Sequence, residues 1–207
     1  MELTHPITNY SEIEQMSQFL KSQSNRNYLL FVMGINLGFR VSDYTQQRVG
    51  FYREACERGF VELKPEKQSN KKKKERAIAE GRDTSGIKPA KRVYVAIPAE
   101  LSKTILAYID GRGDEEFMFP SRKGGTPITR QQIYKIITDA AKHVGITESI
   151  GCHGMRKTFG YWHFKKNKNV RLLMEIFGHS SEEVTLRYIG VTDEDIKESM
   201  ISMNLGL

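Results

Sequence analysis

Cys152-His-Gly-Met-Arg-Lys157 introduces the part of the sequence in which the helical pattern is clearest. A helix is expected over residues 155–165, and a second over 170–177, which Gly178 would end. A third helix is expected over 182–188. Three consecutive helices with short connections predict helix-on-helix packing in this half of the chain.

Helical patterns also precede this region, and several carry their own start or stop signal. Ser11 and Glu14 form a capping-box pattern that predicts a helix to about residue 21. Gly38 predicts the end of a mostly buried helix, and Ser42 predicts the cap of a short helix that carries Asp43. The further helices are expected over residues 25–37, 51–58, 100–109, 129–144 (capped by Thr129 with Gln132) and 193–205.

A β-hairpin is the other predicted element. Phe60, Val61 and Leu63 predict a strand, and the alternating residues 92–98 predict its antiparallel return. The insertion between them, about residues 64–92, is interpreted as an enlarged hairpin tip. We therefore expect a mainly α fold with a small antiparallel β-sheet (α+β), in a single domain over residues 1–207, because no linker composition interrupts the chain.

The basic charge of the chain is concentrated in that insertion. The 207 residues carry a formal net charge of +7, and residues 64–92 alone hold eleven lysines or arginines against four acidic residues. One basic segment on a neutral body indicates a polyanionic partner, usually nucleic acid. A solvated surface loop has the same composition, so charge alone leaves both interpretations open.

Composition excludes several classes of protein. The two cysteines are too few for a disulfide scaffold and lack Cys-x-x-Cys spacing. The longest apolar run, residues 28–35, is too short to cross a bilayer, and the first residues do not follow a signal-peptide pattern. A membrane protein, a secreted disulfide-rich domain and a zinc finger are therefore excluded, and a cytoplasmic protein is expected.

Four short patterns hold side chains suited to phosphoryl transfer without a metal: Gly38-Phe-Arg-Val-Ser-Asp43, Cys152-His-Gly-Met-Arg-Lys157, Phe177-Gly-His-Ser-Ser181 and Leu186-Arg-Tyr-Ile189. The guanidinium groups of Arg40 and Arg156 match the oxygen geometry of a phosphodiester, and His179 adds a third donor. His153 lies one helical turn from Arg156 and is suited to proton transfer near neutral pH. Tyr188 supplies the oxygen nucleophile that a covalent intermediate requires.

In their order and spacing, these residues resemble the catalytic domain of the tyrosine recombinase (phage integrase) family. The resemblance implies site-specific cutting and rejoining of DNA through a 3′-phosphotyrosyl intermediate, with Tyr188 as the nucleophile and Asp43 supporting the first arginine. It implies a catalytic set of Arg40, Lys67, His153, Arg156, His179 and Tyr188.

The hairpin lysines are assigned by the same resemblance. Lys67 fits the family's general acid, although Gln68 follows it where threonine is usual, and the lysines at 71–74 remain rivals. The DNA-binding side chains are expected to be Lys71, Lys72, Lys73, Lys74 and Arg76. The resemblance further implies double-stranded DNA as partner, no cofactor or metal, and a homotetramer on DNA joined through the C-terminal helix.

The chain departs from the family pattern at its N-terminal end. Most members have a separate helical core-binding domain, which clamps DNA, before the catalytic domain. Too few residues precede Arg40 to build that domain. We therefore expect a catalytic domain alone, either as a natural form, like the bacterial fimbrial phase inverters, or as a trimmed chain of bacterial or phage origin that associates with the nucleoid.

Three alternatives are open at this stage. A type IB topoisomerase would use the same chemistry to relax supercoils without pairing two sites. A non-catalytic DNA-binding regulator would use the basic hairpin, with the motif residues in structural roles. A metal site could combine Cys152, His153, His163 and His179, although their separations match no common ligand spacing.

Overall fold

The structure, a computed structural model, describes residues 4–63, 71–85 and 92–191, together with residues 195, 197 and 201. Its helices are α1 (Tyr10–Gln23), α2 (Asn25–Leu37), α3 (Val41–Thr45), α4 (Val49–Arg58), α5 (Lys71–Ala79), α6 (Ala99–Ile109), α7 (Arg130–His143), α8 (Gly151–Asn167), α9 (Val170–Phe177) and α10 (Glu182–Ile189). The strands are β1 (Phe60–Leu63) and β2 (Val93–Ala96). The predicted α+β class is confirmed. Lys67 and most of the expected helix over 193–205 lie outside the described residues.

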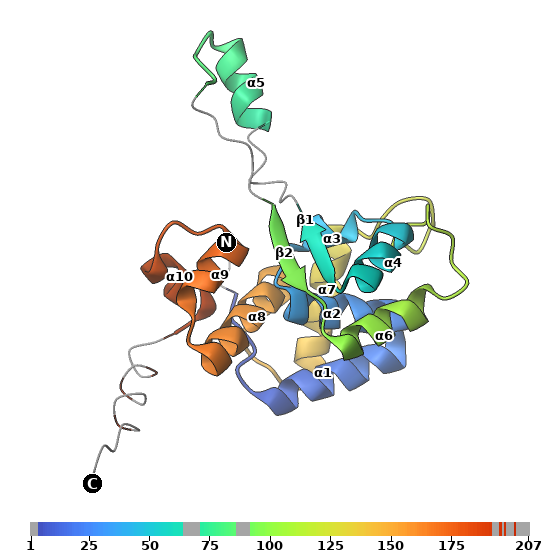
Figure 1. Ribbon diagram of the computed structural model, residues 1–207. Coiled ribbons are helices and arrows are strands. Elements are labelled where there is room, and N and C mark those ends of the chain that lie inside the picture. The colour runs from blue at the N-terminus through green and yellow to red at the C-terminus, as the bar shows by residue number, and fades with distance from the viewer. Residues whose placement is uncertain are drawn as a thin grey trace.

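Helix α2 is the centre of the fold. It packs against α1, α6 and α8, and its apolar side chains are buried almost all around the helix, as expected for a core helix. In Figure 1, α9 and α10 lie on one side of α8 and α4 and α6 lie on the other, while β2 contacts α9. No described helix is long and apolar enough to cross a membrane.

Helices α8, α9 and α10 pack closely because α8 carries a glycine where they meet. A Cβ atom on Gly160 would lie 2.5 Å from Cγ2 of Ile189 and 2.8 Å from Cζ of Phe177. Real Cβ contacts are longer than this, so only glycine permits the approach. The residues that follow α9 and those in α10 are thereby held against the middle of α8.

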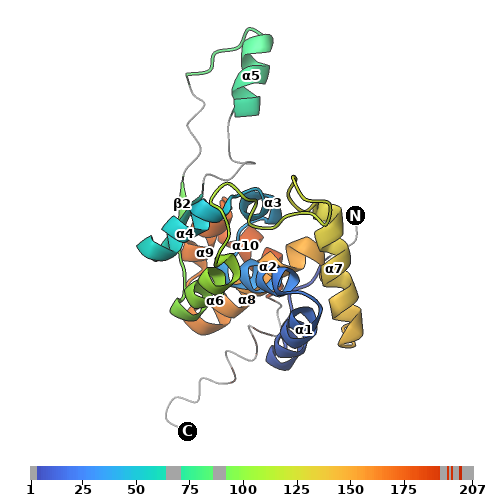
Figure 2. The ribbon, with the colours of Figure 1, turned by 90° about the vertical axis from the view of Figure 1, so that its right-hand side faces the viewer.

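The predicted antiparallel hairpin is confirmed, and the structure gives its register and the face that it buries. β1 and β2 are antiparallel, with Val61 opposite Val95 and Leu63 opposite Val93, and these four side chains are buried. Helix α5 was not predicted: it lies in the insertion, beyond the hairpin and apart from the body in Figures 1 and 2. Turn-forming glycines in the insertion suggested a loop, but residues 71–79 are mostly strong helix formers.

The observed helix starts show which of the predicted N-terminal caps are correct. Thr129 and Gln132 form the predicted reciprocal capping box of α7. Two other caps were predicted wrongly: Asn9 rather than Ser11 caps α1, by accepting from the backbone N–H of Ser11, and Ser42 lies inside α3. Helix α8 begins at residue 151, four residues before its predicted start, so His153 lies in its first turn.

We predict that Gly38→Ala destabilises the fold much more than Gly59→Ala. Both glycines end helices with positive φ, 63° and 75°. A Cβ on Gly38 would lie 2.3 Å from Cδ1 of Phe159, whereas no atom lies within 4 Å of the same position at Gly59. Left-handed strain costs each variant about 1 kcal/mol, and overpacking adds about 1–3 kcal/mol at Gly38.

Urea denaturation of the two variants and the wild type measures these losses. Gly59→Ala is the matched control, because it changes the backbone strain without changing the packing. Equal losses for the two variants would contradict the close approach of Phe159 to Gly38.

Candidate active site

Arg156 is a buried arginine that connects α8 to the ends of α2 and α9 by hydrogen bonds. Its side chain rises from α8 and the residue is only 3% exposed. One guanidinium nitrogen, Nη1, donates to the carbonyl of Gly38 (2.5 Å), and Nη2 donates to the carbonyl of Phe177 (3.1 Å). The guanidinium carbon lies 4.4 Å from the centroid of the Phe177 ring. Burial lowers the pKa of Arg156 to about 10, so the group stays charged at neutral pH.

Arg40 joins Arg156 from the loop between α2 and α3. Gly38 ends α2, and Arg40 occupies the position just before α3. Its Nη1 lies 3.9 Å from Oδ2 of Asp43, which is buried one turn into α3. The resemblance implied that Asp43 supports Arg40, and the two side chains do form an ion pair.

His179 follows α9 and is held by the start of α10. Gly178 ends α9 in the left-handed conformation, which turns the chain toward Ser181, the cap of α10. Nδ1 of His179 lies 3.1 Å from Oγ1 of Thr185, a buried residue of α10. Burial lowers the pKa of His179, and the positive charges of Arg156 and Arg40 lower it further.

Tyr188 lies against the same group of side chains. Its ring centroid is 5.0 Å from that of His179 and 5.3 Å from that of Phe177, both in edge-on contact. Burial raises the pKa of Tyr188, while Arg156, through its charge and a hydrogen bond, and Arg40, through its charge, act in the opposite direction. Because the burial effect is the largest, the phenol keeps its proton at neutral pH.

A small cavity of about 40 Å³ lies beside the two arginines. Its lining residues come from the loop before α3, from the first turns of α3 and α7 and from the first two turns of α8: Arg40, Val41, Ser42, Arg130, Cys152, His153 and Arg156. His153 therefore stands next to the arginines, as their spacing predicted. Arg130 was not singled out from the sequence; its only signal is its position directly after the Thr129 cap.

Lys157 is a second residue that the sequence did not identify. Its ammonium nitrogen lies 5.4 Å from the centroid of the Tyr188 ring and donates to the backbone carbonyl of Thr4 (2.6 Å). A cation near an aromatic ring is attracted by the ring's electrons, so Lys157 helps to fix the position of Tyr188.

Other predicted site residues are not part of this group. Arg76 is exposed on α5, where it pairs with Glu80. The side chains at 71–74 and Lys67 lie outside what the structure describes. The suggested metal site is also not assembled: within the described ranges, no three His, Cys, Asp or Glu side chains lie close enough to hold a metal ion.

Comparison with known proteins shows which family this chain resembles. A sequence profile described as the Phage integrase family matches residues 7–195. The chain is 31% identical to the "Probable integrase/recombinase YoeC" of Bacillus subtilis over 207 residues, which is the full length of both chains. Several curated tyrosine recombinases are longer, and the chain spans between 25% and 60% of their length.

Solved structures share the fold at lower identity. The crystal structure of XerA recombinase matches with a TM-score of 0.70 and 19% identity, covering 99% of this chain and 68% of that one. The structure of the Tn1549 transposon integrase in complex with transposon right end DNA matches with a TM-score of 0.66 and 18% identity, covering 99% and 67%.

Proposed function

The chain belongs to the phage integrase family, and from this membership we propose that it is a site-specific recombinase that cuts and rejoins DNA through Tyr188. The observation that supports this role is the grouping of two arginines and a histidine around one tyrosine. Arginine forks suit phosphate oxygens, and tyrosine is a nucleophile that retains the energy of the phosphodiester in a covalent bond. The partner is double-stranded DNA.

The proposed reaction exchanges one phosphoester for another. The Tyr188 oxygen attacks the scissile phosphorus, a 3′-phosphotyrosyl bond forms, and the bond to the 5′ oxygen breaks. The released 5′ oxygen takes up a proton and leaves as a hydroxyl. The 5′ hydroxyl of a partner strand then attacks the phosphotyrosine and restores the phenol, which completes strand exchange with no net loss of phosphoester bonds.

The charged side chains have separate roles in this scheme. Arg40 and Arg156 hold the non-bridging oxygens and stabilise the charge of the pentacovalent transition state. His153 exchanges a proton at the site, and His179 donates to a phosphoryl oxygen when it is protonated. The phenol of Tyr188 must lose its proton during attack, because burial holds its pKa above the ordinary value.

The basic hairpin insertion completes the DNA contact. We assign the general acid to Lys67, which protonates the leaving 5′ oxygen, and phosphate binding to Lys71–Lys74 and Arg76. Support comes from α5, which lies beyond the hairpin (Figure 1) and carries this basic run. Such a helix is suited to phosphate contacts that position the duplex without selecting its sequence.

Two alternatives from the sequence are not favoured. The relatives found are named recombinases and integrases, which disfavours a role limited to supercoil relaxation. The grouping of a nucleophile with its activating charges disfavours a purely DNA-binding role. We further propose that residues 1–207 act as one catalytic domain on nucleoid DNA in the cytoplasm, and that the basic hairpin insertion contributes to DNA binding.

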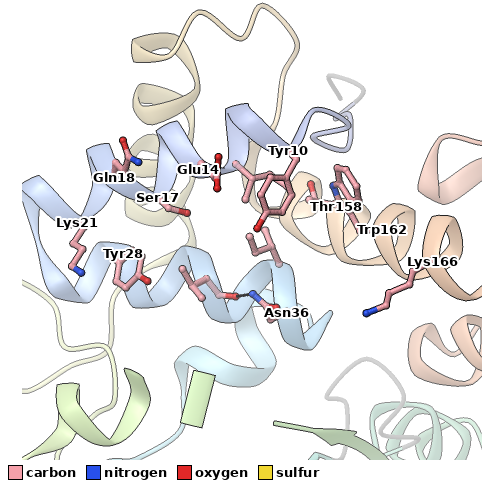
Figure 3. A pocket seen from close by; sticks show the side chains of 13 residues that line it. Tyr10, Glu14, Ser17, Gln18, Lys21, Tyr28, Asn36, Thr158, Trp162 and Lys166 are labelled. Atoms are coloured by element: carbon pink, nitrogen blue, oxygen red, sulfur yellow. Dashed lines mark hydrogen bonds between the residues drawn. The ribbon is translucent and has the colours of Figure 1, made fainter. Parts of the chain in front are cut away.

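We also propose that four protomers assemble on DNA through their C-terminal segments. A groove of about 680 Å³ between α1, α2 and α8 offers a receptor for the segment of a neighbouring copy. Figure 3 shows Tyr10 and Trp162 in this groove, with Lys21 and Lys166 toward opposite ends. The segment 193–205 begins with acidic residues and continues with apolar ones, so both its charge and its apolar side chains suit such a groove.

For the nucleophile, we expect Tyr188→Phe to abolish covalent attachment and to preserve DNA affinity. The substitution removes one oxygen and keeps the ring between Phe177 and His179. A nicked suicide duplex should give an SDS-resistant protein–DNA adduct with the wild type and none with the variant. An adduct formed by the variant would exclude Tyr188 as the attacking residue.

For the general acid, we expect Lys67→Ala to cleave ordinary DNA slowly and to recover on DNA with sulfur at the bridging 5′ position. A thiol has a pKa of about 8.5, so thiolate leaves without the proton that an alkoxide needs. Lys72→Ala is the matched control: its binding should weaken, its salt dependence should flatten, and sulfur should not rescue it. Rescue of a different hairpin lysine would move the assignment away from Lys67.

For assembly, we expect deletion of residues 194–207 to leave adduct formation intact and to reduce cooperative binding to paired sites. Reversing the groove charges with Lys21→Glu and Lys166→Glu together should reduce cooperativity in the same way. Lys142→Glu, at an exposed position at the end of α7, is the control for net charge. Gel-shift and synapsis assays measure both effects, and unchanged cooperativity in either variant would contradict docking in this groove.

A further inference from the structure

A short chain of hydrogen bonds connects the imidazole of His179 to the start of α10. Nδ1 of His179 lies 3.1 Å from Oγ1 of Thr185. The same hydroxyl donates to the backbone carbonyl of Ser181 at 2.9 Å. Thr185 is fully buried, so water does not compete for its hydroxyl. The geometry of α10 therefore determines which way this hydroxyl faces.

The number of protons available in these hydrogen bonds determines which nitrogen of the His179 imidazole carries a hydrogen. A hydroxyl has one proton, and that of Thr185 is used in the bond to Ser181. What faces His179 is therefore an oxygen lone pair, so Nδ1 must carry the hydrogen. We propose that Thr185 is a positioning residue that fixes His179 as its Nδ1–H tautomer and leaves Nε2 as the reactive nitrogen. This proposal deepens the proposed function and rests on it for its catalytic consequence.

The consequence is that His179 starts the reaction as an acceptor. Its lowered pKa keeps it neutral at neutral pH, and a neutral Nδ1–H ring has its lone pair on Nε2. The ring contacts Tyr188, which must lose a proton. Transfer from the phenol breaks its O–H bond, forms Nε2–H and leaves a phenolate beside an imidazolium. That imidazolium is then the donor to a phosphoryl oxygen.

The charged and titratable groups around His179 come from α8, α9, α10 and the residue before α3, while β2 contributes the apolar Val93. They are Arg40 before α3, Arg156 in α8, Arg171 and Glu175 in α9, and Glu182 and Tyr188 in α10. The two arginines that lower its pKa belong to the phosphate clamp. A bound phosphate would offset their charge, so proton uptake by His179 is coupled to the arrival of DNA.

Nitrogen-15 NMR of histidine-labelled protein tests the tautomer directly. At pH 8, Nδ1 of His179 should give the signal of a protonated nitrogen and Nε2 that of an unprotonated one; the His179→Asn spectrum assigns the signals. This measurement on the wild type needs no folded variant of Thr185. An Nε2–H signal in the wild type would overturn the proposal.

Substitution of Thr185 gives the matched comparison. Thr185→Ser keeps the hydroxyl and should keep the Nδ1–H signals, whereas Thr185→Val should shift His179 toward the Nε2–H form and lower its pKa further. Thr45→Val removes a hydroxyl with the same backbone bond in α3, also from a buried threonine, and should leave the His179 signals unchanged. Retention of the Nδ1–H signals in Thr185→Val would overturn the proposal.

The kinetic readout separates this proposal from the proposed function. Thr185→Val should form the suicide-duplex adduct about tenfold more slowly, which is the effect of losing one hydrogen bond to a reacting group. Its DNA affinity should be unchanged, its dependence on pH should shift, and Thr185→Ser should restore the rate. Equal rates for the valine variant and the wild type would overturn the catalytic consequence, whereas an adduct from Tyr188→Phe would overturn the proposed function alone.

Discussion

The active site depends on one buried guanidinium group. Arg156 bridges the carbonyls of Gly38 and Phe177, which end α2 and α9. A buried charge that lost these partners would be strongly destabilising, so the helix ends are held where the arginine needs them. Arg40 follows Gly38 and His179 follows Phe177 by two residues each. The hydrogen bonds that satisfy Arg156 therefore also position the two side chains that are proposed to act beside it.

Burial and the nearby positive charges have opposite effects on the pKa of Tyr188. The hydrophobic contacts that hold the Tyr188 ring raise its pKa, and the two arginines only partly offset that effect. In the DNA-free protein the nucleophile is thus oriented but not ionised. In the proposed reaction, ionisation requires a group that removes the proton at the moment of attack, and His179, whose pKa is lowered by burial and by the same arginines, is the proposed acceptor. In that scheme the arginines lower the pKa of the base as well as holding the phosphate.

Sequence signals predicted what depends on neighbours along the chain. The capping box of Thr129 and Gln132 was predicted because its two residues lie close in sequence, and the two hairpin strands were predicted from their apolar residues and the alternation of residues 92–98. The start of α8 was predicted too late, because its first turn contains Gly151 and Gly154, which are poor helix formers. Gly154 is instead required by packing, because a Cβ there would lie 2.9 Å from the backbone oxygen of His5. Motif order singled out side chains that the fold brings together, but the contact of Thr185 with His179 forms only when α10 turns back toward His179.

The segment before α1 also contributes to the placement of the nucleophile. The backbone N–H of Ile7 donates to Thr158, and its carbonyl accepts from the indole of Trp162, so the segment is fastened along α8. A Cβ on Gly190, two residues after Tyr188, would lie 3.2 Å from Pro6. Lys157 reaches from α8 to both this segment and the tyrosine ring. The segment is thus fixed to α8 and closes against the end of α10, so its attachment limits how far the nucleophile can move away from the arginines.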